Sequence, residues 1–191
     1  MHCLLLRAVC CGAALGIACL TGCGAPASDA TPLTAGERET LQRLTSWTRE
    51  NTFEDIRRYI PDLEREKTAL PVPASLAGGR VTLFEVEFDG NLVLGDNGLV
   101  QAGYGVEQLD ETDARALYDR ILFGLTELYG EYKEETRRGE PFVGRSATWS
   151  PPDGRWIGLS LIHIPANDEG WAVIFMMARD KGIIPWPPTE D

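Results

Sequence analysis

The chain has 191 residues, 43% of them hydrophobic, and a formal net charge of −11 at pH 7. This length is sufficient for one good hydrophobic core, so we expect a single domain. Lys and Arg are outnumbered and scattered along the sequence, which argues against a surface for phosphate backbones and therefore against a nucleic acid partner.

The first segment has the pattern of an export signal. Arg7 precedes a largely apolar run over residues 8–20, and about 13 apolar residues are too few to span a bilayer comfortably. The run closes with Leu20-Thr21-Gly22-Cys23. These four residues resemble the lipobox of bacterial lipoproteins, in which an aliphatic residue and two small residues precede the cysteine. We therefore expect a signal peptide over residues 1–22.

The resemblance to bacterial lipoproteins implies a lipid anchor. A diacylglyceryl group would join the thiol of Cys23, cleavage would occur before it, and acylation (palmitate, for example) of the new amine would follow, because two or three acyl chains anchor a protein stably. Gly24 follows in place of the aspartate that often retains such proteins in the inner membrane. The domain is then expected outside the cytoplasm, in the periplasm and on the outer membrane where a cell has one. An ordinary secretory signal or an uncleaved anchor is the alternative.

The cysteines restrict the chemistry of the rest of the chain. All five lie in the first 23 residues, so the body has no thiol for a disulfide, for catalysis or for a cysteine-based zinc site. Residues 23–34 have the composition of a linker and are expected to form the lipidated tether. A single domain is expected over residues 35–182, followed by a proline-rich tail over residues 183–191.

Two helical segments are expected at the start of the domain. Thr34 and Glu37 have capping-box spacing, and the apolar positions that follow predict a helix over residues 35–50. A second short helix is expected to begin near Phe53 and to be limited by Pro61. The strongest helical pattern follows Asp110 or Thr112, with apolar residues on one stripe until Gly130, its expected stop.

The strands are expected in two groups of about three. Residues 80–88 alternate as a half-buried strand, Asp89-Gly90-Asn91 is expected to turn the chain into residues 92–94, and Asp96-Asn97-Gly98 into residues 99–104. The second group comprises residues 142–149, 156–164 and 171–178, and residues 131–140 are expected to form a solvated loop. This order predicts an α+β fold with an antiparallel sheet of about five to six strands packed against one long helix.

Residues 117–178 also resemble small exported bacterial domains of uncharacterised function. The similarity lies in a helix ending in Leu-Tyr-Gly, a strand with Thr-Trp, a Pro-Asp-Gly turn and two apolar strands. These are turn and core residues, so the resemblance implies a fold and no activity.

Candidate chemistry in the body is sparse. Glu85 and Glu87 share one face of the expected strand and could, with Asp89, coordinate a cation or act as an acid/base pair, but a solvated strand face is the favoured interpretation. His163 is the one histidine of the body and lies among apolar residues, which favours a packing role. We therefore expect no metal site and no cofactor, and we identify no catalytic residue in the sequence.

The proline-rich tail is expected to be extended, because Ile183-Ile184-Pro185-Trp186-Pro187-Pro188 contains too many prolines to continue a strand. It could dock on its own domain or bind in an aromatic-lined groove of a partner. For the protein as a whole, we expect a membrane-anchored lipoprotein with a non-catalytic binding domain for a protein or envelope component. A carboxylate-based hydrolase and an inhibitor of a basic exported enzyme are the alternatives.

Overall fold

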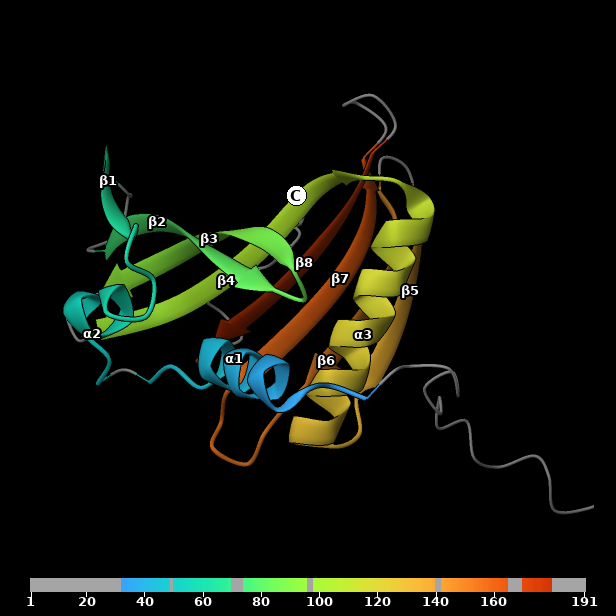
Figure 1. Cartoon of the computed structure of the whole chain (residues 1–191), viewed down its shortest axis with the longest axis horizontal. Coiled ribbons are helices and arrows are strands. Elements are labelled where there is room, and N and C mark those ends of the chain that lie inside the picture. Colours follow the sequence, from blue (N-terminus) through green and yellow to red (C-terminus); the bar gives the residue numbers. More distant parts are fainter. Residues whose placement is uncertain are drawn as a thin grey trace, which may run out of the picture.

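The computed structural model describes residues 32–48, 50–69, 74–95, 98–139, 142–164 and 170–179. The expected signal peptide, Cys23 and the tail 183–191 lie outside these ranges. Within them, three helices and eight strands form one α+β unit (Figure 1). No helix of the described ranges is both long enough and apolar enough to cross a bilayer.

Helices α1 (Ala35–Thr45) and α2 (Phe53–Arg57) both begin with capping boxes. The backbone N–H of Thr34 donates to the carboxylate of Glu37 at 2.8 Å, and the backbone N–H of Glu37 donates to the Thr34 hydroxyl at 3.3 Å. Helix α1 ends five residues earlier than the expected residue 50. The hydroxyl of Thr45 bonds back to the carbonyl of Leu41 at 2.8 Å, and such back-bonding competes with the continuation of a helix.

Helix α3 (Glu111–Tyr129) confirms the strongest helical pattern of the sequence. Asp110 is its N-cap and accepts a hydrogen bond from the backbone N–H of Asp113 at 2.8 Å. The helix stops at Gly130, whose φ of 79° is readily adopted by glycine. Its buried stripe packs on two strands of the sheet, β7 (Trp156–Ile164) and β8 (Gly170–Ala178), which confirms that the sheet packs against the long helix.

The sheet has eight antiparallel strands, so the expectation of five to six was too low. The remaining strands are β1 (Glu64–Ala69), β2 (Ala74–Leu83), β3 (Val86–Gly95), β4 (Gly98–Leu109), β5 (Lys133–Gly139) and β6 (Phe142–Trp149), and the order is β1-β2-β3-β4-β8-β7-β6-β5. The two unpredicted strands, β1 and β5, are the edges. Their sequences, EREKTA and KEETRRG, are highly charged, which suits edge strands that must not pair with other chains. The expected loop 131–140 is therefore largely strand.

The first predicted strand is interrupted by a hairpin turn. Phe84 and Glu85 connect β2 to β3 with φ values of 55° and 62°, whereas the sequence predicted one continuous strand over residues 80–88. Asp89, Gly90 and Asn91, predicted as a turn, lie within β3. Two non-glycine residues with positive φ are unusual for a turn of this kind, and for that reason the alternation of the sequence did not reveal it.

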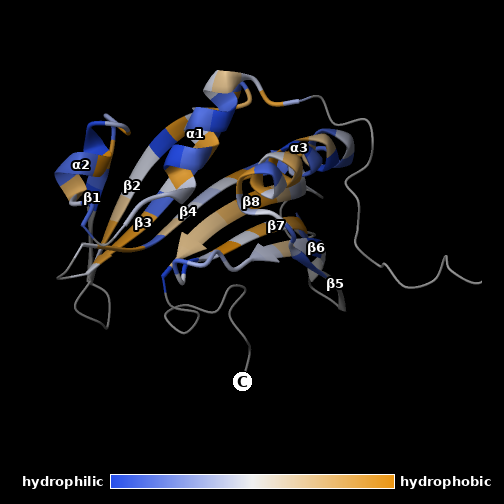
Figure 2. Cartoon of the chain, turned by 90° about the horizontal axis from the view of Figure 1, so that it is seen from below, coloured by the Kyte–Doolittle hydropathy of each residue, from blue (hydrophilic) through white to orange (hydrophobic). Residues whose placement is uncertain are grey.

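All three helices lie on the same side of the sheet (Figure 2). We call this helix-covered side the inner face and the opposite side the outer face. The core fills the inner layer, where Phe175 stacks on Tyr104 with ring centroids 5.0 Å apart and meets Phe88 edge-on at 5.6 Å. Helix α1 closes this layer by contacting α3 and β2.

Candidate functional site

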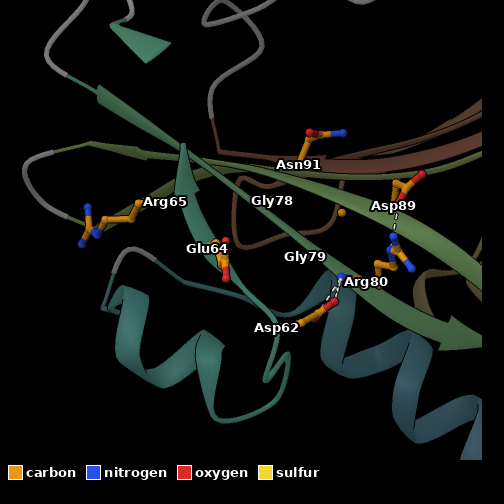
Figure 3. A pocket seen from close by; sticks show the side chains of 9 residues that line it. Asp62, Glu64, Arg65, Gly78, Gly79, Arg80, Asp89 and Asn91 are labelled. Carbon is orange, nitrogen blue, oxygen red and sulfur yellow. Dashed lines mark hydrogen bonds and ion pairs between the residues drawn. The ribbon is translucent and has the colours of Figure 1, made fainter. Parts of the chain in front are cut away.

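A groove lies at the β1 edge of the sheet, over β1, β2 and β3 (Figure 3). Charged and amide side chains alternate there with glycine backbone. The residues that line it are Asp62, Glu64, Arg65, Gly78, Gly79, Arg80, Asp89, Gly90 and Asn91.

The connection from α2 into β1 sets one wall of the groove. Ile60 and Leu63 are each 1% exposed and anchor this connection in the core. Between them, Asp62 accepts the backbone N–H of Arg80 through both carboxylate oxygens, at 3.1 and 3.2 Å. Gly79 is required at this point, because a Cβ there would lie 2.8 Å from Cγ2 of Ile60. The carboxylate of Asp62 thus extends the pairing of β2 beyond the start of β1.

Arg80 forms an ion-pair network on the outer face of β2 and β3. Its guanidinium lies 3.1 Å from a carboxylate oxygen of Glu87 and 3.7 Å from one of Asp89. The three side chains are between 61% and 82% exposed, so these pairs contribute little stability. In these ion pairs, the charge of Arg80 is paired with the charges of Glu87 and Asp89.

A second row of groove residues contains two side chains, Glu64 and Asn91, that have no partner among the described residues. Glu64 pairs with Gly78 in the β1–β2 ladder, and Gly78 pairs with Asn91 in the β2–β3 ladder. Paired residues of antiparallel strands present their side chains on one face, and the central position carries only a hydrogen atom. Among the described residues, the side chains of Glu64 and Asn91 make neither a hydrogen bond nor an ion pair. A carboxylate and an amide therefore flank an open glycine position.

The structure brings two of the three predicted site residues together. Glu87 and Asp89 are both bound to Arg80, whereas Glu85 lies in the hairpin turn with a φ of 62°. Sequence reasoning missed Asp62, Glu64, Arg80 and Asn91, because the strand pairing that unites them was not predicted. His163 lies on β7 with its ring 5.0 Å from that of Trp171, which agrees with a packing role.

A second charged cluster lies on the inner face and has a structural role. The guanidinium of Arg145 binds Glu134 at 2.8 Å and lies 5.3 Å from the ring centre of Tyr118 on α3. Tyr118 is 1% exposed, and burial raises the pKa of its hydroxyl well above the usual range. This cluster connects β5 and β6 to the long helix.

Within the described ranges, no group of three or more His, Cys, Asp and Glu side chains is arranged to hold a metal ion. The residues that line the groove offer hydrogen bonds and charges of both signs. No protein family, curated protein or solved structure matches this chain.

Proposed function

We propose that this chain is a bacterial lipoprotein whose extracytoplasmic domain binds a partner of the cell envelope. The anchor would be the lipid on Cys23, supported by the sequence Leu20-Thr21-Gly22-Cys23 and by the short apolar run before it. In this arrangement, residues 23–34 would separate the domain from the membrane surface. Leu33 marks the end of that tether, since it is 8% exposed and belongs to the core.

The binding surface would be the groove, and the uncommitted pair of Glu64 and Asn91 beside Gly78 carries this proposal. A carboxylate and an amide oxygen both accept hydrogen bonds, and a cation with several N–H donors satisfies both. The net charge of −11 attracts basic partners over a longer range. We therefore favour a basic side chain of an envelope protein as the group that the groove binds.

A carboxylate-based hydrolase has less support. Its three candidate acids were Glu85, Glu87 and Asp89, of which two are paired with Arg80 and one lies in the turn. A general acid works best in a site that excludes water, whereas the Glu87 and Asp89 side chains are 62% and 82% exposed. For the third alternative, an inhibitor of a basic exported enzyme, no observation gives more support than for binding of an envelope partner in general.

The anchor is tested in cells with labelled palmitate. A Cys23→Ser variant is expected to lose the label and to leave the membrane fraction. A Cys19→Ser variant is the matched control, because it changes a cysteine that precedes the lipobox. Retention of both label and membrane association by Cys23→Ser would contradict the lipid anchor.

The groove is tested by NMR with a tetralysine peptide as the probe. We expect shifts in the backbone amides of Gly78 and Asn91, and we expect Glu64→Gln with Asn91→Ala to reduce the affinity at least several-fold. Tetraglutamate is the matched control and should leave these amides unchanged. Shifts caused equally by both peptides, or spread over the helices, would contradict the proposed site.

A further inference from the structure

No described helix covers the outer face of the sheet (Figure 2). The centre of this face is nevertheless apolar. Along β8 the outward residues include Ala172, Met176 and Ala178, which are 0%, 7% and 8% exposed, and Ile162 on β7 is 9% exposed. A side chain on a solvated sheet face normally keeps more contact with water than this. These exposures are those of a covered face.

The shape of this face could accommodate an extended polypeptide segment. Gly103, Met176 and Gly158 form one continuous row across β4, β8 and β7. A Cβ at Gly158 would lie 2.4 Å from the Trp156 ring, so the indole lies directly over that glycine. The glycines leave a shallow trough beside Met176, and Trp156 forms one of its walls.

The trough also contains an unsatisfied acceptor. Gln101 pairs with Ala178 in the β4–β8 ladder and is 9% exposed, yet its side-chain oxygen accepts no hydrogen bond from the described part of the chain. A buried amide oxygen without a hydrogen-bond donor is unfavourable, because it has lost its contact with water. An extended segment over this face would bring backbone N–H donors close to it.

The chain that follows β8 starts at this trough. Arg179 still donates its backbone N–H to the carbonyl of Val100 at 3.4 Å, and the sequence then continues over residues 180–191 with Ile183, Ile184 and Trp186 among prolines. A polyproline-type segment of that length extends roughly 35 Å, whereas the nine residues of β8 extend about 30 Å. The segment is long enough to run back along the whole strand.

The amino-terminal side of the chain enters from the opposite layer. Leu33 packs on the inner side against Gly124 of α3, where a Cβ would lie 2.6 Å from Cδ1 of Leu33. The carboxyl-terminal segment is therefore the nearer candidate for covering the outer face.

We propose that residues 180–188 dock on the outer face of their own domain, with Ile183, Ile184 and Trp186 over the trough at Met176 and Gly158. Prolines prevent this segment from joining the sheet as a strand, so side-chain packing holds it in place. The segment then hides an apolar surface that would otherwise bind other proteins or membranes.

Two adjacent methionines provide the test. Met176 faces the trough and Met177, 1% exposed, faces the core, and the only other methionine is Met1. Peroxide oxidation of the full chain, read by mass spectrometry, should be slow at both. In an Ile183→Ser, Ile184→Ser, Trp186→Ala variant, Met176 should oxidise several-fold faster while Met177 stays protected. An unchanged rate at Met176 would overturn the proposal, as would protection of the intact chain that is lost on dilution, since that would assign the cover to a second copy.

A cysteine pair decides the matter if the triple variant loses its fold and both methionines oxidise. In a chain whose native cysteines are replaced by serine, Ser160→Cys on the outer face of β7 is combined with Ile184→Cys. We expect this pair to close into a disulfide much faster than the control pair of Thr82→Cys with Ile184→Cys, because Thr82 lies on β2 near the far end of the same face. Equal closure rates would overturn the proposal.

Discussion

Trp47 donates its indole N–H to the hydroxyl of Tyr104 across 3.0 Å, in the core and 57 residues apart in sequence. Trp47 follows the end of α1 and is 4% exposed, while Tyr104 lies on the inner face of β4 and is 1% exposed. Burial raises the pKa of the Tyr104 hydroxyl well above its usual range, so the group remains a neutral acceptor. This contact attaches the segment between α1 and α2 to the middle of the sheet.

Replacing Tyr104 by Phe should lower the free energy of unfolding by about 1–3 kcal/mol, because the indole N–H of Trp47 is left buried without an acceptor. The measurement is urea unfolding followed by circular dichroism. Tyr59→Phe is the matched control, because the Tyr59 ring meets Trp47 edge-on at 5.9 Å and its hydroxyl makes no hydrogen bond among the described residues. Equal losses for both variants would contradict the assigned role of the bond.

The pairing of Glu37 should make stability depend on pH in the acid range. Burial by itself would raise the pKa of Glu37, but the hydrogen bonds from Thr34 and the charge of Arg120 outweigh it and hold the pKa below the usual 4.5. A pKa that is lower in the folded state means that the stabilisation is present above about pH 4.5 and is lost as pH falls through the folded value. Urea unfolding at pH 6 and at pH 3 should therefore show a smaller difference for Glu37→Gln than for the natural chain. Glu39→Gln is the control, since its contact with Arg43 is long at 3.9 Å and exposed.

Two helical glycines should respond to alanine with opposite signs. In α3, a Cβ at Gly124 would lie 2.6 Å from Cδ1 of Leu33 and 2.7 Å from Cδ2 of Leu41, two side chains that are buried and have little room to shift. Crowding of this kind costs about 1–3 kcal/mol, of which helix propensity offsets about 1 kcal/mol. In α1, nothing lies within 4 Å of a Cβ at Gly36, so Gly36→Ala should stabilise, by less than the roughly 1 kcal/mol of a helix interior because Gly36 lies in the first turn. Thermal unfolding of both variants checks the prediction, and stabilisation by Gly124→Ala would show that Leu33 and Leu41 make room for a methyl group at little cost.

The turn between β2 and β3 should improve with glycine at its second position. Glu85 is exposed and has a φ of 62°, a conformation that costs a non-glycine residue about 1–2 kcal/mol. Glu85→Gly should therefore raise the free energy of unfolding by about 1 kcal/mol, whereas Glu85→Ala, which keeps the strained backbone, should not. Chemical denaturation of the two variants separates the backbone effect from the loss of charge.

The first residue of the same turn should behave differently. Phe84 also has a positive φ, but it is 8% exposed and lies 4.8 Å beneath the guanidinium of Arg120. Phe84→Ala should lose about 3 kcal/mol, as expected for a buried aromatic side chain. A loss below about 1 kcal/mol in the same denaturation experiment would show that the contact with Arg120 and the core does not hold the turn.

Features encoded by local signals could be predicted from the sequence. The cap at Asp110, the apolar stripe of α3 and the stop at Gly130 are all short-range, and the structure confirms them. The same holds for strands β6, β7 and β8, whose apolar runs are separated by turn residues. The general class, an α+β fold with an antiparallel sheet, followed from their order.

The elements that the sequence does not predict, strands β1 and β5 and the turn at Phe84–Glu85, have a common physical cause. Strands β1 and β5 are edges with one partner each, so their sequences need few apolar residues and look like solvated loops. At Phe84–Glu85 the turn changes which residues face inward: Leu83 and Val86 are paired neighbours on the same side. The alternation of residues 80–88 therefore has the pattern of a single strand.

The candidate site depended on those same misses. Glu64 lies on an unpredicted strand, and Asp89-Gly90-Asn91 has the composition of a turn, so no local pattern indicates that Gly78 brings Glu64 and Asn91 into one row. Only the pair of Glu87 and Asp89 could be recognised from spacing alone. Local sequence patterns predict helices and strands through their periodicity, but they do not indicate which distant strands pair.

The seam between β4 and β8 determines how this domain must assemble. Of the seven ladders among the described strands, six join neighbours in sequence and one joins β4 to β8 across the whole of α3, β5, β6 and β7. Each four-strand half can form its pairings locally, but the seam requires closure of a long loop, and such closures slow folding. We expect the rate-limiting step of folding to be the meeting of two preformed halves, with Phe175 closing against Tyr104 as they join.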